Sequence, residues 1–428
     1  MAYPCPMSSE GLTSASRVVV VGAGLAGLTC AVELASRGID CLVVEASDGI
    51  GGRVRTDVVD GFRLDRGFQV LLTAYPEARR ALDYGALRLK PFFPGAVIRA
   101  GGRFRRLADP WRAPVAAVTG VLSGVVPPTD ALRIARLRHR LLGGVGTPKG
   151  RRSFGPTSDR LAAEGFSNTA IKRFFRPFFG GVFLDPELGT SERQMEFVFR
   201  MFASGDIAIP ALGMGEIPAQ LAARLPGSAI RTHCRVDSVD GTGVRLDNGD
   251  TLDADAVVVA VDAGTAHRLG VVSHEPRWRT TTCVYFDAPV APIGGPALIL
   301  NGEGEGPVNN LCVMSEVSPE VAPPGSSLVS VTVIGRRHET EAGEAGVRAQ
   351  LAGWFGETVN QWRHLRSYSI DRALPAYEEP LEAEASARVR NGLFVCGDYL
   401  ADPSINGAMS SGRFAAEAVA AQLEGATR

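Results

Sequence analysis

The chain has 428 residues, enough for two or three domains that each bury a hydrophobic core. Lys and Arg together number 45 and Asp and Glu 46, so the net charge is −1 and gives no support to nucleic-acid binding. With 45% hydrophobic and 21% charged residues the composition excludes a disordered chain, and seven cysteines without a CxxC pair argue against a disulfide framework or a metal site, which favours a cytoplasmic location.

The N-terminal region contains no basic stretch followed by an apolar run, so the sequence predicts no secretion signal. The residues from Arg17 to Glu45 then read RVVVVGAGLAGLTCAVELASRGIDCLVVE. An apolar run, a glycine turn, a helical stretch and a second apolar run follow one another. This order predicts a βαβ unit with strands at 18–21 and 41–44 and a helix at 25–37.

The glycine turn has the spacing GxGxxG, formed by Gly22, Gly24 and Gly27. The first glycine permits a tight turn, the second lets a pyrophosphate approach the backbone, and the third lets the helix pack closely on the strand. The N–H groups at the start of the helix, at Leu25 and Ala26, would face the phosphates. The turn therefore predicts a dinucleotide site, with a purely structural turn as the alternative.

Glu45 ends the second strand, eighteen residues after Gly27. A carboxylate at this position accepts hydrogen bonds from both hydroxyls of an adenosine ribose and repels a 2′-phosphate. NADP is therefore disfavoured, whereas this motif leaves the choice between FAD and NAD open.

A second glycine-rich segment, ASDGIGGRVRT at residues 46–56, follows directly and places a cation after two glycines. Together the two segments resemble the signature of the flavin-containing amine oxidase superfamily, which includes amine and L-amino-acid oxidases, protoporphyrinogen oxidases and phytoene desaturases. The matching positions of the second segment are Ala46, Gly51, Gly52, Arg53 and Thr56. The resemblance implies FAD as cofactor, with the two glycines and the arginine beside its diphosphate.

Later segments extend the resemblance along the chain. FRLDRGFQVL at 62–71 resembles the stretch that runs past the flavin, GMG at 213–215 a second glycine turn, and RVDSV at 235–239 the strand that pairs with adenine. GLFVCGDYLADPSINGAMSSGRFAAEAV at 392–419 resembles the closing motif, in which a Gly-Asp pair meets the diphosphate-ribityl end and a helix opening at Gly407 directs N–H groups at the flavin O2 edge. The residues expected to contact the cofactor are Gly22, Gly24, Leu25, Ala26, Gly27, Glu45, Ala46, Gly51, Gly52, Arg53, Gly67, Phe68, Gln69, Val236, Gly397, Asp398, Asn406, Gly407, Ala408 and Met409.

The segment from Arg99 to Arg152 carries a net charge of +10, which leaves −11 for the rest of the chain. Within it the pattern predicts a helix capped by Asp130 and ending at Gly143, with an apolar stripe on one face and arginines on the other. A core-facing helix with a solvated arginine face is the simplest interpretation. Peripheral contact of residues 113–142 with an anionic membrane, or a pocket for an acidic substrate, are the alternatives.

Strand-like runs at 280–289, 296–302 and 327–335 suit a sheet beneath a substrate pocket. The stretch SYSIDRALPAY at 367–377 resembles the family segment that approaches the flavin and contains two tyrosines. The candidate pocket residues are Tyr285, Tyr368 and Tyr377, with ordinary core tyrosines as the alternative.

The expected fold is α/β, with a Rossmann-like FAD-binding domain (a glutathione-reductase-type βαβ) and an inserted α+β substrate-binding domain. Flavin-like motifs at both ends and in the middle of the chain assign residues 16–75, 213–270 and 385–428 to the first domain. Residues 76–212 and 271–384 would form the second.

Two features bear on the reaction. The chain has only three lysines, Lys90, Lys149 and Lys172, and none lies in the strand near 279–283 where the resemblance places the lysine of amine-oxidising members. The phenylalanine-rich segment 178–205 instead resembles the protoporphyrinogen oxidase and phytoene desaturase branches, although its phenylalanines are equally compatible with a normal core.

We therefore expect an FAD-dependent oxidoreductase that moves a hydride from a bulky, mostly apolar small molecule to flavin N5, with O2 or a quinone as acceptor. An amine or L-amino-acid oxidase, a redox-neutral flavin-dependent isomerase and a non-enzymatic FAD-binding protein are the alternatives. No cysteine lies between Asp398 and Gly412, where covalently flavinylated members carry one, so FAD would be held non-covalently. No catalytic residue, metal site or oligomeric state follows from the sequence.

Overall fold

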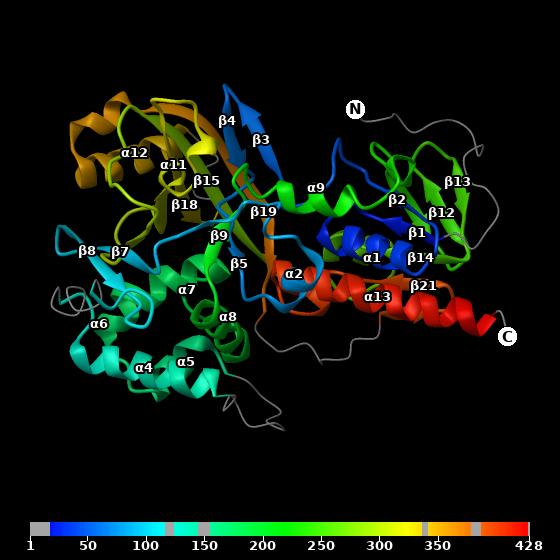
Figure 1. Ribbon diagram of the computed structural model, residues 1–428, viewed down its shortest axis with the longest axis horizontal. Helices are drawn as coiled ribbons and strands as arrows, with labels where there is room; N and C mark the ends of the chain where they lie inside the picture. The colour runs from blue at the N-terminus through cyan, green and yellow to red at the C-terminus, as the bar shows by residue number, and fades with distance from the viewer. Residues whose placement is uncertain (1–17, 116–123, 144–154, 336–340, 378–386, 427–428) are drawn as a thin grey trace.

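The computed structural model describes residues 18–115, 124–143, 155–335, 341–377 and 387–426. Two large sheets organise these residues, one at each end of the molecule (Figure 1). The sequence therefore folds as the expected α/β protein with a second sheet-containing region.

The first sheet has six strands, and the first five in spatial order run parallel to one another. In order they are β10 (Ile230–Arg231), β2 (Cys41–Val44), β1 (Val18–Val21), β14 (Ala256–Val259), β21 (Leu393–Val395) and the antiparallel edge strand β20 (Arg388–Arg390). The predicted βαβ unit is thus confirmed, with β1 and β2 paired in register and α1 (Leu25–Ser36) as the connecting helix.

The four consecutive valines of β1 are all buried because both faces of this sheet are covered. Val18 and Val20 pack into the cluster that includes α1 and the long C-terminal helix α13 (Ile405–Ala426), which lie side by side in Figure 1. Val19 and Val21 pack against a hairpin sheet on the other face. That sheet consists of β11 (Val236–Val239), β12 (Gly243–Leu246) and β13 (Thr251–Asp253), with Gly249 at φ +92° in the predicted turn.

The second sheet has seven strands, in the order β19 (Arg363–Pro375), β15 (Trp278–Ala288), β18 (Ser327–Ile334), β17 (Asn310–Val313), β16 (Leu298–Asn301), β7 (Gly95–Ala100) and β8 (Arg103–Ala108). The three strands predicted at 280–289, 296–302 and 327–335 are β15, β16 and β18. Alternate residues of β18, Val329, Val331 and Val333, pack with Val347 of α12 (Glu341–Phe355). The opposite face of the sheet is free to line a cavity.

Further helices and small strands complete the described residues. They are β3 (Thr56–Val59), β4 (Phe62–Asp65), β5 (Leu71–Leu72), α2 (Pro76–Ala81), β6 (Lys90–Pro91), α4 (Pro128–Leu142), α5 (Thr157–Ala163), α6 (Asn168–Ala170), the π-helical turn η1 (Ile171–Phe175), α7 (Arg176–Phe183), α8 (Glu192–Ser204), β9 (Ile207–Ile209), α9 (Glu216–Ala222), α10 (Ala263–Arg268) and α11 (Met314–Val317). Because β5 pairs with β9, strands from both predicted domains share one small sheet, and the exact domain boundaries stay a prediction.

Helix α4 (Pro128–Leu142) begins three residues earlier than a helix capped by Asp130 would. Pro127 and Pro128 start it, since the fixed φ of proline suits a first turn, and the predicted capping role of Asp130 is wrong. Asp130 is instead fully buried within the first turn, where its carboxylate accepts a hydrogen bond from Ser167 N and pairs with Arg133 at 2.7 Å. The helix ends before Gly143, as expected.

The arginine face of α4 is partly neutralised, because Arg133 pairs with Asp130 and Arg140 with Glu164, while Leu132 is exposed. Membrane contact through residues 113–142 stays a prediction, and residues 116–123 within it lie outside the described chain. Among the described helices, none combines the length and the apolar character needed to cross a bilayer.

Candidate functional site

A cavity of about 810 Å³ connects the two sheets. It starts at the residues that follow the C-terminal ends of β1, β2, β14 and β21, and it reaches α7, α8 and the inner face of the seven-stranded sheet. Open parallel sheets bind ligands at this edge of their strands. The cavity therefore has a sheet-edge half, where a dinucleotide is expected, and a second half between α7, α8 and β15–β18.

The first glycine loop lines the sheet-edge half of the cavity as its spacing predicts. Gly22 has φ +106°, and a Cβ there would lie 2.7 Å from the Ala260 carbonyl oxygen. Around a Cβ at Gly24, no protein atom lies within 4 Å, so this glycine faces open space. Helix α1 starts at the next residue without a side-chain cap, which leaves its first N–H groups available to a phosphate.

Gly27 does not line the cavity. A Cβ at this position would lie 2.0 Å from the Gly22 carbonyl oxygen, so its hydrogen is what lets α1 pack against the turn. This is the packing role expected of the third motif glycine, and direct contact with the cofactor is not supported.

The second glycine loop lies against the first. Gly51 N donates a hydrogen bond to Ala23 O at 2.8 Å, and Gly51 and Gly52 have φ +105° and +59°. A Cβ at Gly52 would lie 3.3 Å from Gly24 Cα. The two loops thus form one continuous backbone wall, with Ala46 also lining the cavity.

Glu45 lines the same wall, and its carboxylate is held by backbone. Oε2 accepts the N–H of Ala23 and Oε1 accepts the N–H of Ser47, both at 2.8 Å. Because an ionised carboxylate has about four acceptor sites, roughly two remain for the two hydroxyls of a ribose. The geometry suits the role predicted for this residue.

Arg53 and Asp398 both line the cavity and form an ion pair at 2.6 Å across 345 positions of sequence. Arg53 also donates to the carbonyl oxygen of Ala373 at 3.0 Å. Asp398 follows Gly397, whose N–H is held by Ser411 Oγ at 3.0 Å. The pair joins the second glycine loop to the closing motif, an arrangement that neither motif reveals by itself.

The predicted contacts from the middle of the chain also reach the cavity. Gly67, Phe68 and Gln69 line it, and Gln69 donates to the carbonyl oxygen of Arg53 at 2.7 Å. Val236, at the start of β11, lines the sheet-edge half.

The start of α13 differs from the expectation. The helix begins at Ile405, two residues before Gly407, because the Ser404 hydroxyl accepts the N–H of Gly407 at 3.0 Å. Residues Pro403, Ser404, Ile405 and Ala408 line the cavity. Ser404, a preferred helix-capping residue after a proline, was the signal for this start.

Three residues of this motif therefore do not line the cavity: Asn406, Gly407 and Met409. Asn406 Oδ1 accepts the N–H of Glu77 at 3.1 Å and ties α13 to α2, while Met409 is fully buried. The helix N-terminus still faces the cavity, through its first turn.

Only one of the three candidate tyrosines lines the cavity, namely Tyr368, whose hydroxyl donates to Asp57 at 2.8 Å. Tyr285 is buried behind it, with its ring edge-on at a centroid distance of 6.1 Å and its hydroxyl donating to Asp65 O. Tyr377 lies outside the cavity lining, and its carbonyl accepts the N–H of Ser191. Tyr285 and Tyr377 as pocket walls are thus corrected: Tyr285 lies on the same face of β15 as the cavity-lining Thr281, but it is packed behind Tyr368 and the Asp65 backbone.

The second half of the cavity was largely missed by sequence reasoning. Every described lining residue that α7, α8, β9 and β15–β18 contribute, together with Leu184 after α7, is uncharged: Pro177, Phe178, Gly181, Val182, Phe183, Leu184, Gln194, Val198, Phe202, Ile207, Thr281, Leu298, Asn310 and Thr332. The phenylalanine-rich segment was the available signal, but only some of its phenylalanines line the cavity. Phe178, Phe183 and Phe202 line the cavity, whereas Phe179 lies in the core and Phe197 stacks on Tyr75.

Neither Lys90 nor Lys172 lines the cavity, and Lys149 lies outside the described residues. Lys90 pairs with Glu320 at 3.1 Å. The strand position at which amine-oxidising relatives were expected to carry a lysine presents the hydroxyl of Thr281, which donates to Val333 O at 2.9 Å.

A buried acidic residue, Asp65, lies directly before the Gly67–Gln69 loop. Burial raises the pKa of its carboxyl from 3.8 to about 6, although hydrogen bonds from the Thr56 hydroxyl and Met214 N–H favour the ionised form. The same Thr56 hydroxyl accepts the N–H of Gly215 at 2.8 Å, so the glycine turn at 213–215 serves this network rather than the cavity.

We predict that Asp65 lowers stability as the pH rises. Because its folded pKa lies above the unfolded value, its stabilising contribution is complete below about pH 4 and is lost as the pH passes about 6. The unfolding free energy of Asp65→Asn minus that of wild type should therefore rise by about 2–3 kcal/mol from pH 4 to pH 7. Denaturant unfolding at both pH values measures this difference. Asp240→Asn, at an exposed carboxylate, should show no such gain, and an equal response of both variants would contradict the assignment.

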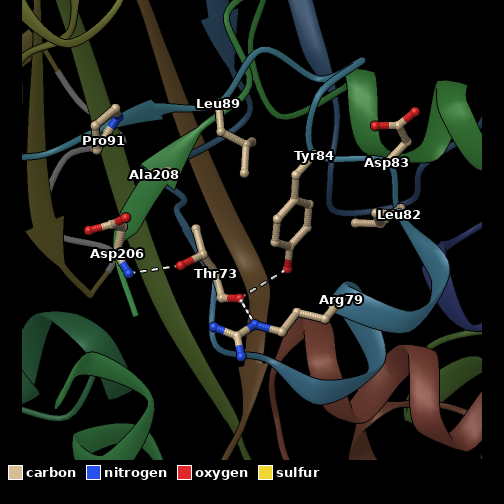
Figure 2. Close-up of a pocket in the computed structure, with 9 residues that line it drawn as sticks. All are labelled: Thr73, Arg79, Leu82, Asp83, Tyr84, Leu89, Pro91, Asp206 and Ala208. Carbon is tan, nitrogen blue, oxygen red and sulfur yellow. Dashed lines mark hydrogen bonds between the residues drawn. The ribbon is translucent and has the colours of Figure 1, made fainter. Parts of the chain in front are cut away.

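A second pocket of about 550 Å³ lies on the other side of the β5–β9–β6 sheet (Figure 2). Ala208 lines it while the neighbouring Ile207 lines the large cavity, as expected for successive strand residues. Some of its polar groups bond within the protein: Figure 2 shows Tyr84 Oη and Arg79 Nε donating to Thr73 O, at 3.3 and 2.6 Å. The pocket shares no lining residue with the large cavity, which is the better candidate site.

Comparison with known proteins agrees with this geometry. Residues 25–420 match the family described as flavin containing amine oxidoreductase. Carotenoid phi-ring synthase of Streptomyces griseus is 28% identical over 362 residues, which are 74% of this chain and 69% of that protein. Protoporphyrinogen oxidase 2 of Arabidopsis thaliana is 42% identical over 81 residues, which cover 19% of this chain and only 16% of that protein.

Among solved structures, a variant of putrescine oxidase superposes with a TM-score of 0.70 at 17% identity, covering 95% of this chain and 99% of that one. At this identity the likeness concerns the fold alone. It agrees with a two-sheet architecture whose cavity starts at the edge of the parallel sheet.

Proposed function

The chain belongs to the flavin-containing amine oxidoreductase family and is an FAD-dependent oxidoreductase, and from this premise we propose that it dehydrogenates a bulky, mostly apolar substrate. One observation carries the proposal: the uncharged, largely apolar and aromatic lining between α7, α8 and the seven-stranded sheet. An apolar wall stabilises an apolar ligand through the surface that both remove from water.

The sheet-edge half of the cavity fits FAD. Gly24 leaves open space beside the start of α1, and Glu45 is fixed by two backbone N–H groups with acceptor capacity to spare. Arg53 would stand beside the diphosphate, balanced by Asp398, and the first turn of α13 would face the flavin end. A helix N-terminus there stabilises negative charge.

FAD, when bound, supplies a hydride acceptor at flavin N5. The chain supplies position and dryness. Phe178, Val198 and Phe202 would hold the substrate and exclude water, while Tyr368 is fixed by Asp57 and forms part of the wall. The described chain presents no lysine to this space, which disfavours amine oxidation. Electrons would leave to O2 or a quinone.

The experiment is anaerobic mixing of the FAD-loaded protein with a polyene such as phytoene, with protoporphyrinogen, with putrescine and with an L-amino acid. We expect the flavin absorbance to bleach with the polyene or the tetrapyrrole and to persist with the amine and the amino acid. Bleaching by the amine or the amino acid alone would contradict the proposal. Turnover of the polyene without net bleaching would instead indicate a redox-neutral isomerase.

A further inference from the structure

Gln194, a polar side chain in the apolar half of the cavity, has no hydrogen-bond partner for its carboxamide among the described residues. Gln194 is only 3% exposed and lines the cavity, and within the described part of the chain its carboxamide forms no hydrogen bond. Its carboxamide atoms are not fully enclosed by protein, so they face the open space of the cavity, where a ligand or water can satisfy them.

The other polar residues of this wall are already engaged. Asn310 Nδ2 donates to Thr332 Oγ1 at 3.2 Å, Asn310 Oδ1 accepts from Asn309 at 2.9 Å, and Thr281 donates to Val333 O. Gln194 therefore differs from its neighbours in having both a donor and an acceptor to offer.

The position of Gln194 directs it toward a ligand. Gln194, Val198 and Phe202 follow one another at intervals of four residues on α8, which places them on one face of the helix. All three line the cavity. A molecule lying along Val198 and Phe202 would thus bring one of its ends or edges to the carboxamide.

We propose that Gln194 recognises a hydroxyl or carbonyl group on an otherwise apolar, elongated substrate; this inference rests on the proposed function and adds a specificity determinant to it. A carboxamide accepts from a hydroxyl and donates to a carbonyl. The group must be neutral, because the elements that form this half of the cavity contribute no charged lining residue among those described, and a buried charge without a partner is strongly unfavourable.

The contact also sets the register of the substrate. Apolar walls attract a long molecule without fixing how far it slides, since the hydrophobic effect is not directional. A hydrogen bond has a preferred distance and angle. Anchoring one polar group at Gln194 would therefore decide which carbon of the substrate reaches the flavin.

The test uses the FAD-loaded protein and three retinoids that differ only at one end: all-trans-retinol, axerophthene, which carries a methyl group in place of the hydroxymethyl group, and all-trans-retinoate. Binding is measured by fluorescence titration in dilute detergent. We expect wild type to bind retinol about fivefold more tightly than axerophthene, the size of one neutral hydrogen bond, and to bind retinoate most weakly. Gln194→Met keeps the shape of the side chain and should equalise retinol and axerophthene by weakening retinol alone.

Val198→Ala, one turn away on the same face, is the matched control and should weaken retinol and axerophthene equally. FAD content and retained axerophthene affinity establish that Gln194→Met is folded. Equal binding of the two compounds by wild type, or a preference that survives in Gln194→Met, would overturn the role of Gln194 while leaving an apolar site in place. Failure of both compounds to bind wild type would overturn the apolar-substrate proposal as well.

Discussion

Replacing Gly24 by alanine is expected to weaken FAD binding while leaving the fold intact. Gly24 has φ −73° and ψ 178°, a conformation that alanine adopts freely, and a methyl group there meets no atom within 4 Å. With the cofactor bound, the methyl group would occupy the space in which the diphosphate approaches the backbone. Steric overpacking of about 1–3 kcal/mol corresponds to an FAD affinity weakened about 10- to 100-fold.

The matched comparison is Gly27→Ala, three residues along the same motif. Its methyl group would lie 2.0 Å from the Gly22 carbonyl oxygen whether or not FAD is present, so this variant should unfold more easily as the apoprotein. The measurements are FAD titration by flavin fluorescence and thermal unfolding of the apoprotein for both variants. A Gly24→Ala apoprotein as destabilised as Gly27→Ala, or full FAD affinity in Gly24→Ala, would contradict the assignment of the two glycines.

Removing the carboxylate of Glu45 should weaken the binding of FAD about 10- to 100-fold. Hydrogen bonds to a charged group contribute about 1.5–3 kcal/mol, and Glu45→Ala removes the acceptor for the ribose together with the anchor for Ala23 N–H and Ser47 N–H. FAD titration of the apoprotein measures the effect. Glu45→Gln, which keeps one acceptor oxygen, should fall between wild type and Glu45→Ala.

Asp48→Ala provides the control for Glu45, because Asp48 belongs to the same loop but is exposed and paired with Arg55. Its FAD affinity should match that of wild type. If Glu45→Ala and Asp48→Ala behave alike, the ribose assignment of Glu45 is wrong.

The sheet-edge half of the site was accessible from the sequence because its chemistry is local. Gly22, Gly24 and Glu45 lie within one βαβ unit, and the spacing of the glycines along the chain predicts the turn conformation that a phosphate needs. The start of α13 shows the limit of this local reading. The resemblance placed the helix opening at Gly407, whereas the cap at Ser404 moves the first turn and removes Asn406 and Met409 from the cavity.

The substrate half could not be located in the same way. Apolar periodicity marks which face of α7 or α8 avoids water, but it does not say whether that face meets the core or a cavity. Phe178 and Phe179 are adjacent and chemically identical, yet the first lines the cavity and the second is buried in the core.

By itself, then, the sequence determined the α/β class, the flavin family and the FAD-facing loops, since glycine spacing and strand-helix order act over short stretches of chain. The tertiary structure alone decided the shape and neutrality of the substrate half, the Arg53–Asp398 pair and the unpaired carboxamide of Gln194. These features arise where segments more than a hundred residues apart pack together, and the packing of distant surfaces, unlike a turn, leaves no local pattern in the sequence.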